Sequence, residues 1–134
     1  MNMIDKVGGV IIKDKRILVV RKKTKENFQE YIIPGGKREC KESDLDTLQR
    51  ELLEELNVSV LEAEYLGKYR DIAVFENIPI MVTTYITTIK GNISVQNEIK
   101  EYEWIDRNFE EKGIKVGSII KKYIIPELIN RGLM

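Results

Sequence analysis

The sequence predicts an α/β fold, in which helices pack on a mixed β-sheet, within one domain spanning residues 1–134. Three observations support this prediction. Segments rich in β-branched residues alternate with segments of helical periodicity, in the order strands, helix, strands, helix. A chain of 134 residues is long enough to bury one core. No internal repeat, low-complexity tract or linker interrupts the chain.

The N-terminal quarter of the chain is expected to form short strands. The apolar, β-branched segments Val7–Ile12 and Ile17–Val20 flank a polar turn at Lys13–Lys15, which is typical of a hairpin. Tyr31–Ile33 is a further short strand that leads into a turn at Pro34-Gly35-Gly36, where two glycines permit close approach of the backbone to a ligand.

The first helix is predicted between Ser43 and Asn57. Ser43 is a suitable N-cap, and Asn57 is the best non-glycine residue for a left-handed C-terminal position. Leucines recur at spacings of three and four and predict one apolar stripe, formed by Leu45, Leu48, Leu52 and Leu56. Three acids lie on a face turned away from most of that stripe, namely Glu51, Glu54 and Glu55.

The C-terminal half is predicted to contain further strands and a second helix. The strands are Val58–Tyr69 with a bulge at Gly67, Ala73–Phe75 paired with Ile80–Ile89 through a turn at Asn77 and Pro79, and Tyr102–Ile105. Helical periodicity covers Ser118–Asn130, where Pro126 should kink or split the helix.

The composition restricts the classes of function. The 22 basic and 22 acidic side chains cancel, so nothing attracts a nucleic-acid polymer to the molecule as a whole. No apolar stretch has the length of a membrane span, and the first residues lack the layout of a signal peptide, which together predict a cytoplasmic protein. Cys40 is the single cysteine of the sequence, so no intramolecular disulfide can form. We interpret it as an incidental thiol of the loop, with a redox or metal-contacting role as the alternative.

The absence of histidine directs attention to the carboxylates. Acid–base chemistry near neutral pH must use carboxylates, lysine, tyrosine or the thiol. A metal site made of carboxylates, backbone carbonyls and water favours a hard cation, Mg²⁺ or Mn²⁺, over Zn²⁺.

Residues 36–58 form a spaced motif that carries this chemistry. The motif reads G-x5-E-x7-R-E-L-x-E-E-x-N-V, beginning at Gly36 and including Glu42, Arg50 and the acids of the predicted helix. It resembles the signature of the Nudix hydrolases, and differs only where Asn57 replaces a glycine. A solvated charged helix face would explain the acids alone, but not their joint spacing with the glycine turn, Glu42 and Arg50. The resemblance implies an α-β-α sandwich with a mixed β-sheet.

The resemblance also implies roles for individual residues. Glu54 and Glu55 would be the main ligands of Mg²⁺ or Mn²⁺, with Gly36 contributing its backbone carbonyl. Glu51 would be a further ligand or the general base. Arg50 would orient the glutamates, and Glu42 would hold the loop to the helix.

The resemblance further implies an acid on a loop before a strand that carries a tryptophan. Trp104 is preceded by several glutamates. Glu98 is the first candidate for an additional ligand or base, and Glu101 is the second.

The expected activity is hydrolysis of a pyrophosphate bond in a nucleoside diphosphate-linked substrate, with a nucleoside triphosphate as the least specialised choice, as in the MutT-like enzymes. Candidate substrate contacts are Arg21 in the basic run before residue 26, Lys37 beside the glycine turn, and Tyr31 as an aromatic near the cleft. A small nucleotide is the expected partner of a monomer or homodimer. The alternative is a nucleotide-sensing module that has the fold but no catalytic activity.

Overall fold

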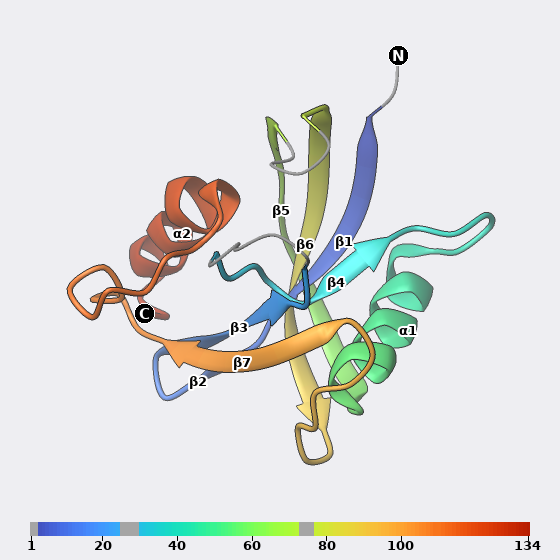
Figure 1. Cartoon of the computed structure of the whole chain (residues 1–134), viewed down its shortest axis with the longest axis horizontal. Coiled ribbons are helices and arrows are strands. Elements are labelled where there is room, and N and C mark those ends of the chain that lie inside the picture. The colour runs from blue at the N-terminus through green and yellow to red at the C-terminus, as the bar shows by residue number, and fades with distance from the viewer. Residues whose placement is uncertain (1–2, 25–29, 73–76) are drawn as a thin grey trace.

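Ten helical and strand segments make up the described part of the computed structural model, which covers residues 3–24, 30–72 and 77–134 (Figure 1). The strands are β1 (Ile4–Val10), β2 (Ile12–Lys13), β3 (Arg16–Lys22), β4 (Gly35–Lys37), β5 (Ser59–Ile72), β6 (Pro79–Lys90) and β7 (Ile99–Ile105). The helical segments are α1 (Asp44–Leu56), a π-helical turn η1 (Ile120–Ile124) and α2 (Ile125–Asn130).

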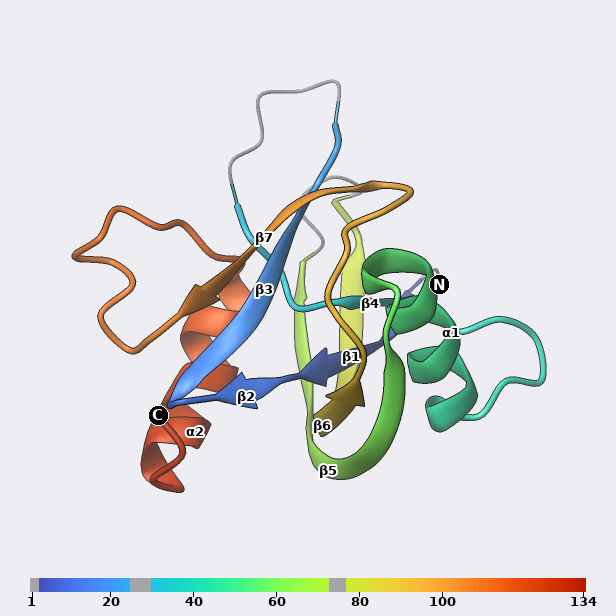
Figure 2. The same ribbon diagram turned by 90° about the horizontal axis from the view of Figure 1, so that it is seen from below.

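The strands of the described residues form two sheets between the helices. The four-stranded sheet has the order β4-β1-β6-β5, and its β1–β6 pair is parallel while the other pairs are antiparallel. The three-stranded antiparallel sheet has the order β2-β3-β7. Helices α1 and α2 lie on opposite sides of these strands in both views (Figures 1 and 2). The predicted α/β sandwich with a mixed sheet is therefore confirmed.

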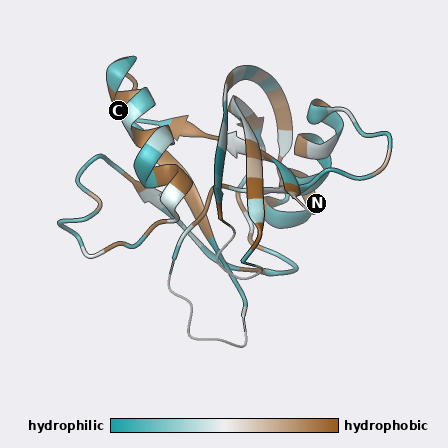
Figure 3. Cartoon of the chain, turned by 90° about the horizontal axis from the view of Figure 1, so that it is seen from above, coloured by the Kyte–Doolittle hydropathy of each residue, from teal (hydrophilic) through white to brown (hydrophobic). Residues whose placement is uncertain are grey.

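Two apolar clusters hold the layers together. Leu48, Leu52 and Leu56 of α1 pack with Val7 and Leu18 on one side. On the other side, residues of η1 and α2 pack with a second set that includes Val10, Ile17, Val19 and Ile105. The hydropathy colouring shows the same arrangement, with apolar segments along the strands and polar residues on the loops (Figure 3). No helix of the described residues is long and apolar enough to cross a membrane.

The N-terminal strands differ from the prediction in two respects. A tight turn with left-handed Asp14 and Lys15 joins β2 to β3, but β1 belongs to the other sheet, so the expected Val7–Ile12 strand is divided at Ile11. The expected turn at Pro34-Gly35-Gly36 contains β4, which pairs with β1, whereas Tyr31 and Ile32 form only isolated bridges. Strand β4 can pair this closely with β1 because Gly35 has no side chain, since a Cβ there would lie 2.1 Å from the Val7 carbonyl oxygen.

Helix α1 begins and ends as predicted. Ser43 accepts a hydrogen bond from the Asp46 N–H in a capping box, and Asn57 is left-handed at φ 58°. The predicted stripe is wrong at Leu45, which is 52% exposed because it lies in the first turn, one turn before the leucines that contact the core. The acids are also placed differently, since Glu51 and Glu55 follow Leu48 and Leu52 by three residues and are buried beside them.

The C-terminal half follows the prediction closely. Strand β5 forms a hairpin with β6 and has register shifts at Val60/Glu62 and at Tyr65/Gly67, as expected for Gly67. The predicted strand at residues 73–75 lies outside the described residues. Helical structure is continuous over residues 118–130, with the π-helical turn η1 directly before α2, and Pro126 lies in the first turn of α2.

Candidate active site

Three carboxylates from distant parts of the chain converge beside the glycines of β4. Glu51 and Glu55 come from α1 and Glu98 from the loop before β7, and one oxygen of each lies within 4.8 Å of the others. Glu51 is 8% exposed and Glu55 is 1% exposed, whereas the Glu98 side chain is 57% exposed, so two of the three carboxyl groups lie in a region of low dielectric. We call Glu51, Glu55 and Glu98 the carboxylate cluster.

Glu98 reaches this cluster because its loop caps the C-terminal end of α1. The last carbonyls of a helix have no partner within the helix. Here the Ser94 and Gln96 N–H groups donate to the carbonyls of Leu56 and Glu55, and the Asn97 side chain donates to the carbonyl of Glu54 at 2.7 Å. The Lys23 N–H donates to the Glu98 carbonyl at 2.7 Å, which fixes the loop to β3.

Glu55 is the most deeply buried member of the cluster. Its Oε1 accepts a hydrogen bond from the Gly35 N–H at 2.9 Å, while its buried Oε2 has no hydrogen-bond partner among the described residues. Burial raises the Glu55 pKa to about 8, against the opposing effects of the Gly35 hydrogen bond and the positive charge of Lys22. A buried carboxylate oxygen without a partner fits a ligand of a hard divalent cation, which would supply the missing positive charge.

Glu51 is held between a guanidinium and a glycine. Arg50 donates to Glu51 Oε1 at 2.8 Å, and a Cβ built on Gly36 would lie 2.3 Å from Glu51 Cδ. Burial raises the Glu51 pKa, and the neighbouring Arg50 opposes that rise. The absence of a side chain at Gly36 therefore provides the space that the Glu51 carboxylate occupies.

Arg50 and Glu42 join the motif loop to α1. Arg50 donates to both oxygens of Glu42, at 2.7 and 2.8 Å, and to the Lys37 carbonyl at 3.0 Å. Hydrogen bonds from Arg50, above all, lower the Glu42 pKa to about 2, and the Arg50 pKa is raised in turn. A planar guanidinium suits this bidentate contact, which a lysine could not reproduce.

Glu54 and Glu101 lie outside the carboxylate cluster. The Glu54 side chain is 51% exposed, with its Oε1 3.7 Å from Arg50. Glu101 is bound by Arg21 at 2.8 Å and by the Tyr31 hydroxyl at 2.5 Å. Of the two acids considered beyond the motif, the structure brings only Glu98 to Glu51 and Glu55. Cys40 is exposed on the motif loop.

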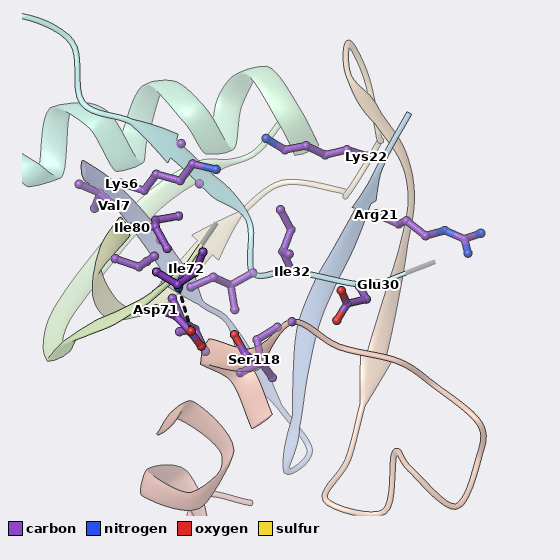
Figure 4. Close-up of a pocket in the computed structure, with 18 of the residues that line it drawn as sticks. Lys6, Val7, Arg21, Lys22, Glu30, Ile32, Asp71, Ile72, Ile80 and Ser118 are labelled. Carbon is purple, nitrogen blue, oxygen red and sulfur yellow. Dashed lines mark hydrogen bonds between the residues drawn. The ribbon is translucent and has the colours of Figure 1, made fainter. Parts of the chain in front are cut away.

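A cavity of about 190 Å³ adjoins the cluster at β4. Lys6 and Lys22 lie at one end and Asp71 and Ser118 at the other (Figure 4). Gly35 and Gly36 also line the cavity, in the strand that pairs with β1 next to Lys6. Between these ends the lining is largely apolar and includes Ile32, Ile33, Ile72, Ile80, Val82 and Ile119. A polar rim at both ends of an apolar space suits a ligand with a charged part and a flat, weakly polar part.

Of the three predicted substrate contacts, only one lines the cavity among the described residues. Arg21 lines the cavity, but its guanidinium is directed toward Glu101 and lies 5.3 Å from the centre of the Tyr31 ring (Figure 4). Tyr31 and Lys37 are not among the described residues that line this cavity. The basic run that contains Arg21 also supplies Lys22 to the lining, whereas Asp71 and Ser118 come from segments far apart in the sequence and no local pattern indicated them.

Comparison with known proteins gives consistent findings. A model of the family described as NUDIX domain matches residues 4–119. An ADP-ribose pyrophosphatase from Methanocaldococcus jannaschii is 28% identical over 123 residues, which cover 88% of this chain and 71% of that protein.

Solved structures show the same similarity at the level of the fold. A Nudix hydrolase from Nitrosomonas europaea has a TM-score of 0.79 at 18% identity, covering 98% of this chain and 90% of that one. A MutT protein from Methanosarcina mazei has a TM-score of 0.78 at 17% identity, covering 96% and 95%.

Proposed function

Since the chain belongs to the Nudix domain family, whose model matches residues 4–119, we propose that it hydrolyses a pyrophosphate bond in a nucleoside diphosphate-linked substrate with Mg²⁺ or Mn²⁺ as cofactor. The family and the similarity to an ADP-ribose pyrophosphatase make the chain a Nudix pyrophosphohydrolase. The substrate, the cation and the residue roles given below are the proposal. The proposal also includes that residues 1–134 form one catalytic domain.

The observation that carries the proposal is the convergence of Glu51, Glu55 and Glu98 next to Gly35, Gly36 and Lys22, which line one end of the cavity. A pyrophosphate carries several negative charges, so it approaches carboxylates only where cations intervene. A divalent cation bound there would neutralise the phosphate oxygens and polarise the bond that breaks.

Each neighbouring residue has a definite task in this proposal. Glu55 and Glu98 would hold the cation together with Glu51 and the carbonyl of the buried Gly36, and Glu54 would complete its ligands from the exposed side. Arg50 would keep Glu51 in place by its hydrogen bond of 2.8 Å. Glu51 would also be the base that accepts the proton of the attacking water, since a raised pKa favours proton transfer near neutral pH.

We propose a nucleoside triphosphate as the first candidate substrate. The cavity of about 190 Å³ lies below the range of about 300–1,000 Å³ that is usual for drug-sized ligands, which favours a single base as its occupant. ADP-ribose is the second candidate, because the relative that is 28% identical is an ADP-ribose pyrophosphatase. The net charge of zero supports a small nucleotide rather than a nucleic-acid polymer.

A substrate panel tests the proposal. Nucleoside triphosphates, ADP-ribose, nucleotide sugars and dinucleoside polyphosphates would be incubated with the protein in Mg²⁺ or Mn²⁺, with a chelator as the control. We expect one class to be cleaved at a pyrophosphate bond and the chelator to stop the reaction. Tight nucleotide binding by calorimetry without hydrolysis of any compound would instead support the non-catalytic sensing module.

A further inference from the structure

Lys22 enters the cavity from the end of β3, where the strand pairing is irregular. The register of β3 with β7 shifts between Arg21 and Lys22, so that Arg21 faces Glu101 and Lys22 faces Ile99. Such irregularities often redirect side chains beside active sites. Arg21 extends away from the cavity, whereas Lys22 extends over it toward β4 and α1 (Figure 4).

The Lys22 ammonium lies beside the carboxylate cluster. Its Nζ is 3.7 Å from Glu98 Oε1, and its positive charge also acts on Glu55. Glu98 is one of the three residues whose oxygens converge within 4.8 Å. The same carboxylate therefore faces the ammonium of Lys22 and the position at which Glu51 and Glu55 would hold a cation.

Two cations cannot both make full use of one carboxylate. Positive charges a few ångströms apart repel each other, and each weakens the attraction of Glu98 for the other. The Lys22 side chain is 28% exposed and its stem is long, so the ammonium can leave Glu98 without disturbing the core.

We propose that Lys22 and the divalent cation compete for Glu98, and that cation binding releases the Lys22 ammonium to bind a phosphate of the substrate. This inference rests on the proposed function. Lys22 lines the cavity together with Gly35 and Gly36, at the end where the cavity meets the cluster. A substrate with its base in the apolar part and its phosphates at the cluster would pass this ammonium.

The competition has a consequence that can be measured without substrate. Removing the ammonium should strengthen cation binding, because Glu98 then serves the cation alone. For an ion pair at a partly exposed site the expected gain is about two- to fivefold in affinity. Removing the same ammonium should weaken substrate binding by about tenfold, since a charged hydrogen bond to phosphate is lost.

The test compares Lys22→Met with the parent protein and with Lys13→Met, which removes an exposed lysine of β2. Calorimetric titration with Mn²⁺ alone should show two- to fivefold tighter binding only for Lys22→Met. At saturating Mn²⁺, the KM of that variant for the best substrate of the panel should rise about tenfold while kcat changes much less.

A double-mutant cycle shows whether Glu98 is the shared residue. In a Glu98→Gln background the gain in Mn²⁺ affinity from Lys22→Met should largely disappear. Unchanged or weaker Mn²⁺ binding by Lys22→Met would overturn the competition, and an unchanged KM would overturn the transfer to phosphate. Because the Mn²⁺ titration needs no turnover, a failure of the proposed hydrolysis would be distinguishable from a failure of this inference.

Discussion

Gly36→Ala should disable the site by displacing the Glu51 carboxylate. The new Cβ would lie 2.3 Å from Glu51 Cδ and 2.4 and 2.6 Å from its oxygens. Ordinary contact begins near 3.4 Å, so the carboxyl group must move by about 1.1 Å, the difference between 3.4 and 2.3 Å. That movement also weakens its hydrogen bond from Arg50. A misplacement of about 1 Å can cost about 100-fold in rate, and we expect kcat/KM to fall by about that factor.

The assay is steady-state hydrolysis of the best substrate of the panel, with circular dichroism to confirm that the variant is folded. Gly9→Ala is the matched control, because it adds a methyl group in β1 against Leu48 at 3.2 Å and Thr87 at 3.3 Å without touching Glu51. Its neighbours need to move by only a few tenths of an ångström, so kcat/KM should stay within about threefold. A folded Gly36→Ala protein with activity similar to the parent would refute the reasoning.

Three further predictions concern α1 and its loop. Leu48→Ala should lower the free energy of unfolding by about 2–5 kcal/mol, because Leu48 is fully buried. Leu45→Ala, at a position that is 52% exposed, should lower it by less than about 0.5 kcal/mol. Urea denaturation measures both changes, and equal losses of stability would contradict the packing described for α1. The Glu42 pKa falls from 4.5 to about 2 on folding, so its stabilising effect is present above about pH 4.5 and is lost as the pH falls toward 2. Unfolding curves of Glu42→Gln and the parent should therefore converge over that range, and a constant difference would exclude this effect. Glu54→Gln should reduce turnover by about 100-fold or more while the fold survives, if Glu54 completes the cation site from its exposed position; near-parental turnover would remove it from the site.

Local signals predicted α1 and its caps well. Ser43 and Asn57 each act on the adjacent turn, so their residue types alone indicate where the helix begins and ends. The resemblance implied that Glu42 joins the loop to the helix but did not name its partner, which in the structure is Arg50, with hydrogen bonds of 2.7 and 2.8 Å.

Features that depend on distant contacts were harder to predict. Leu45 has the correct helical spacing for the apolar stripe, but its side chain is 52% exposed, and periodicity alone does not show which side of the first turn is covered. The short strand β4 pairs with β1, nearly thirty residues earlier in the chain. Gly35 can lie against the backbone of Val7 only because glycine has no Cβ.

The carboxylate cluster combines a feature that local sequence predicts with one that depends on distant contacts. The spacing of Glu51 and Glu55 follows from one helix, whereas Glu98 reaches them through hydrogen bonds between its loop and the end of α1. Glu98 and Glu101 are both glutamates before Trp104, and the sequence does not show that Glu101 lies within β7, opposite Arg21, where Arg21 and Tyr31 bind its carboxylate.

Turnover by Glu55→Gln is the most direct test of the central claim that the carboxylate cluster catalyses pyrophosphate hydrolysis. The amide keeps the shape of the side chain and can still accept the Gly35 N–H, but it lacks the negative charge that a cation requires. Phosphorus-31 NMR in Mg²⁺ would follow cleavage of the best substrate by the parent and by this variant. We predict a loss of at least about 1,000-fold with the fold intact, and a folded variant that cleaves the same bond at the parental rate would contradict the claim.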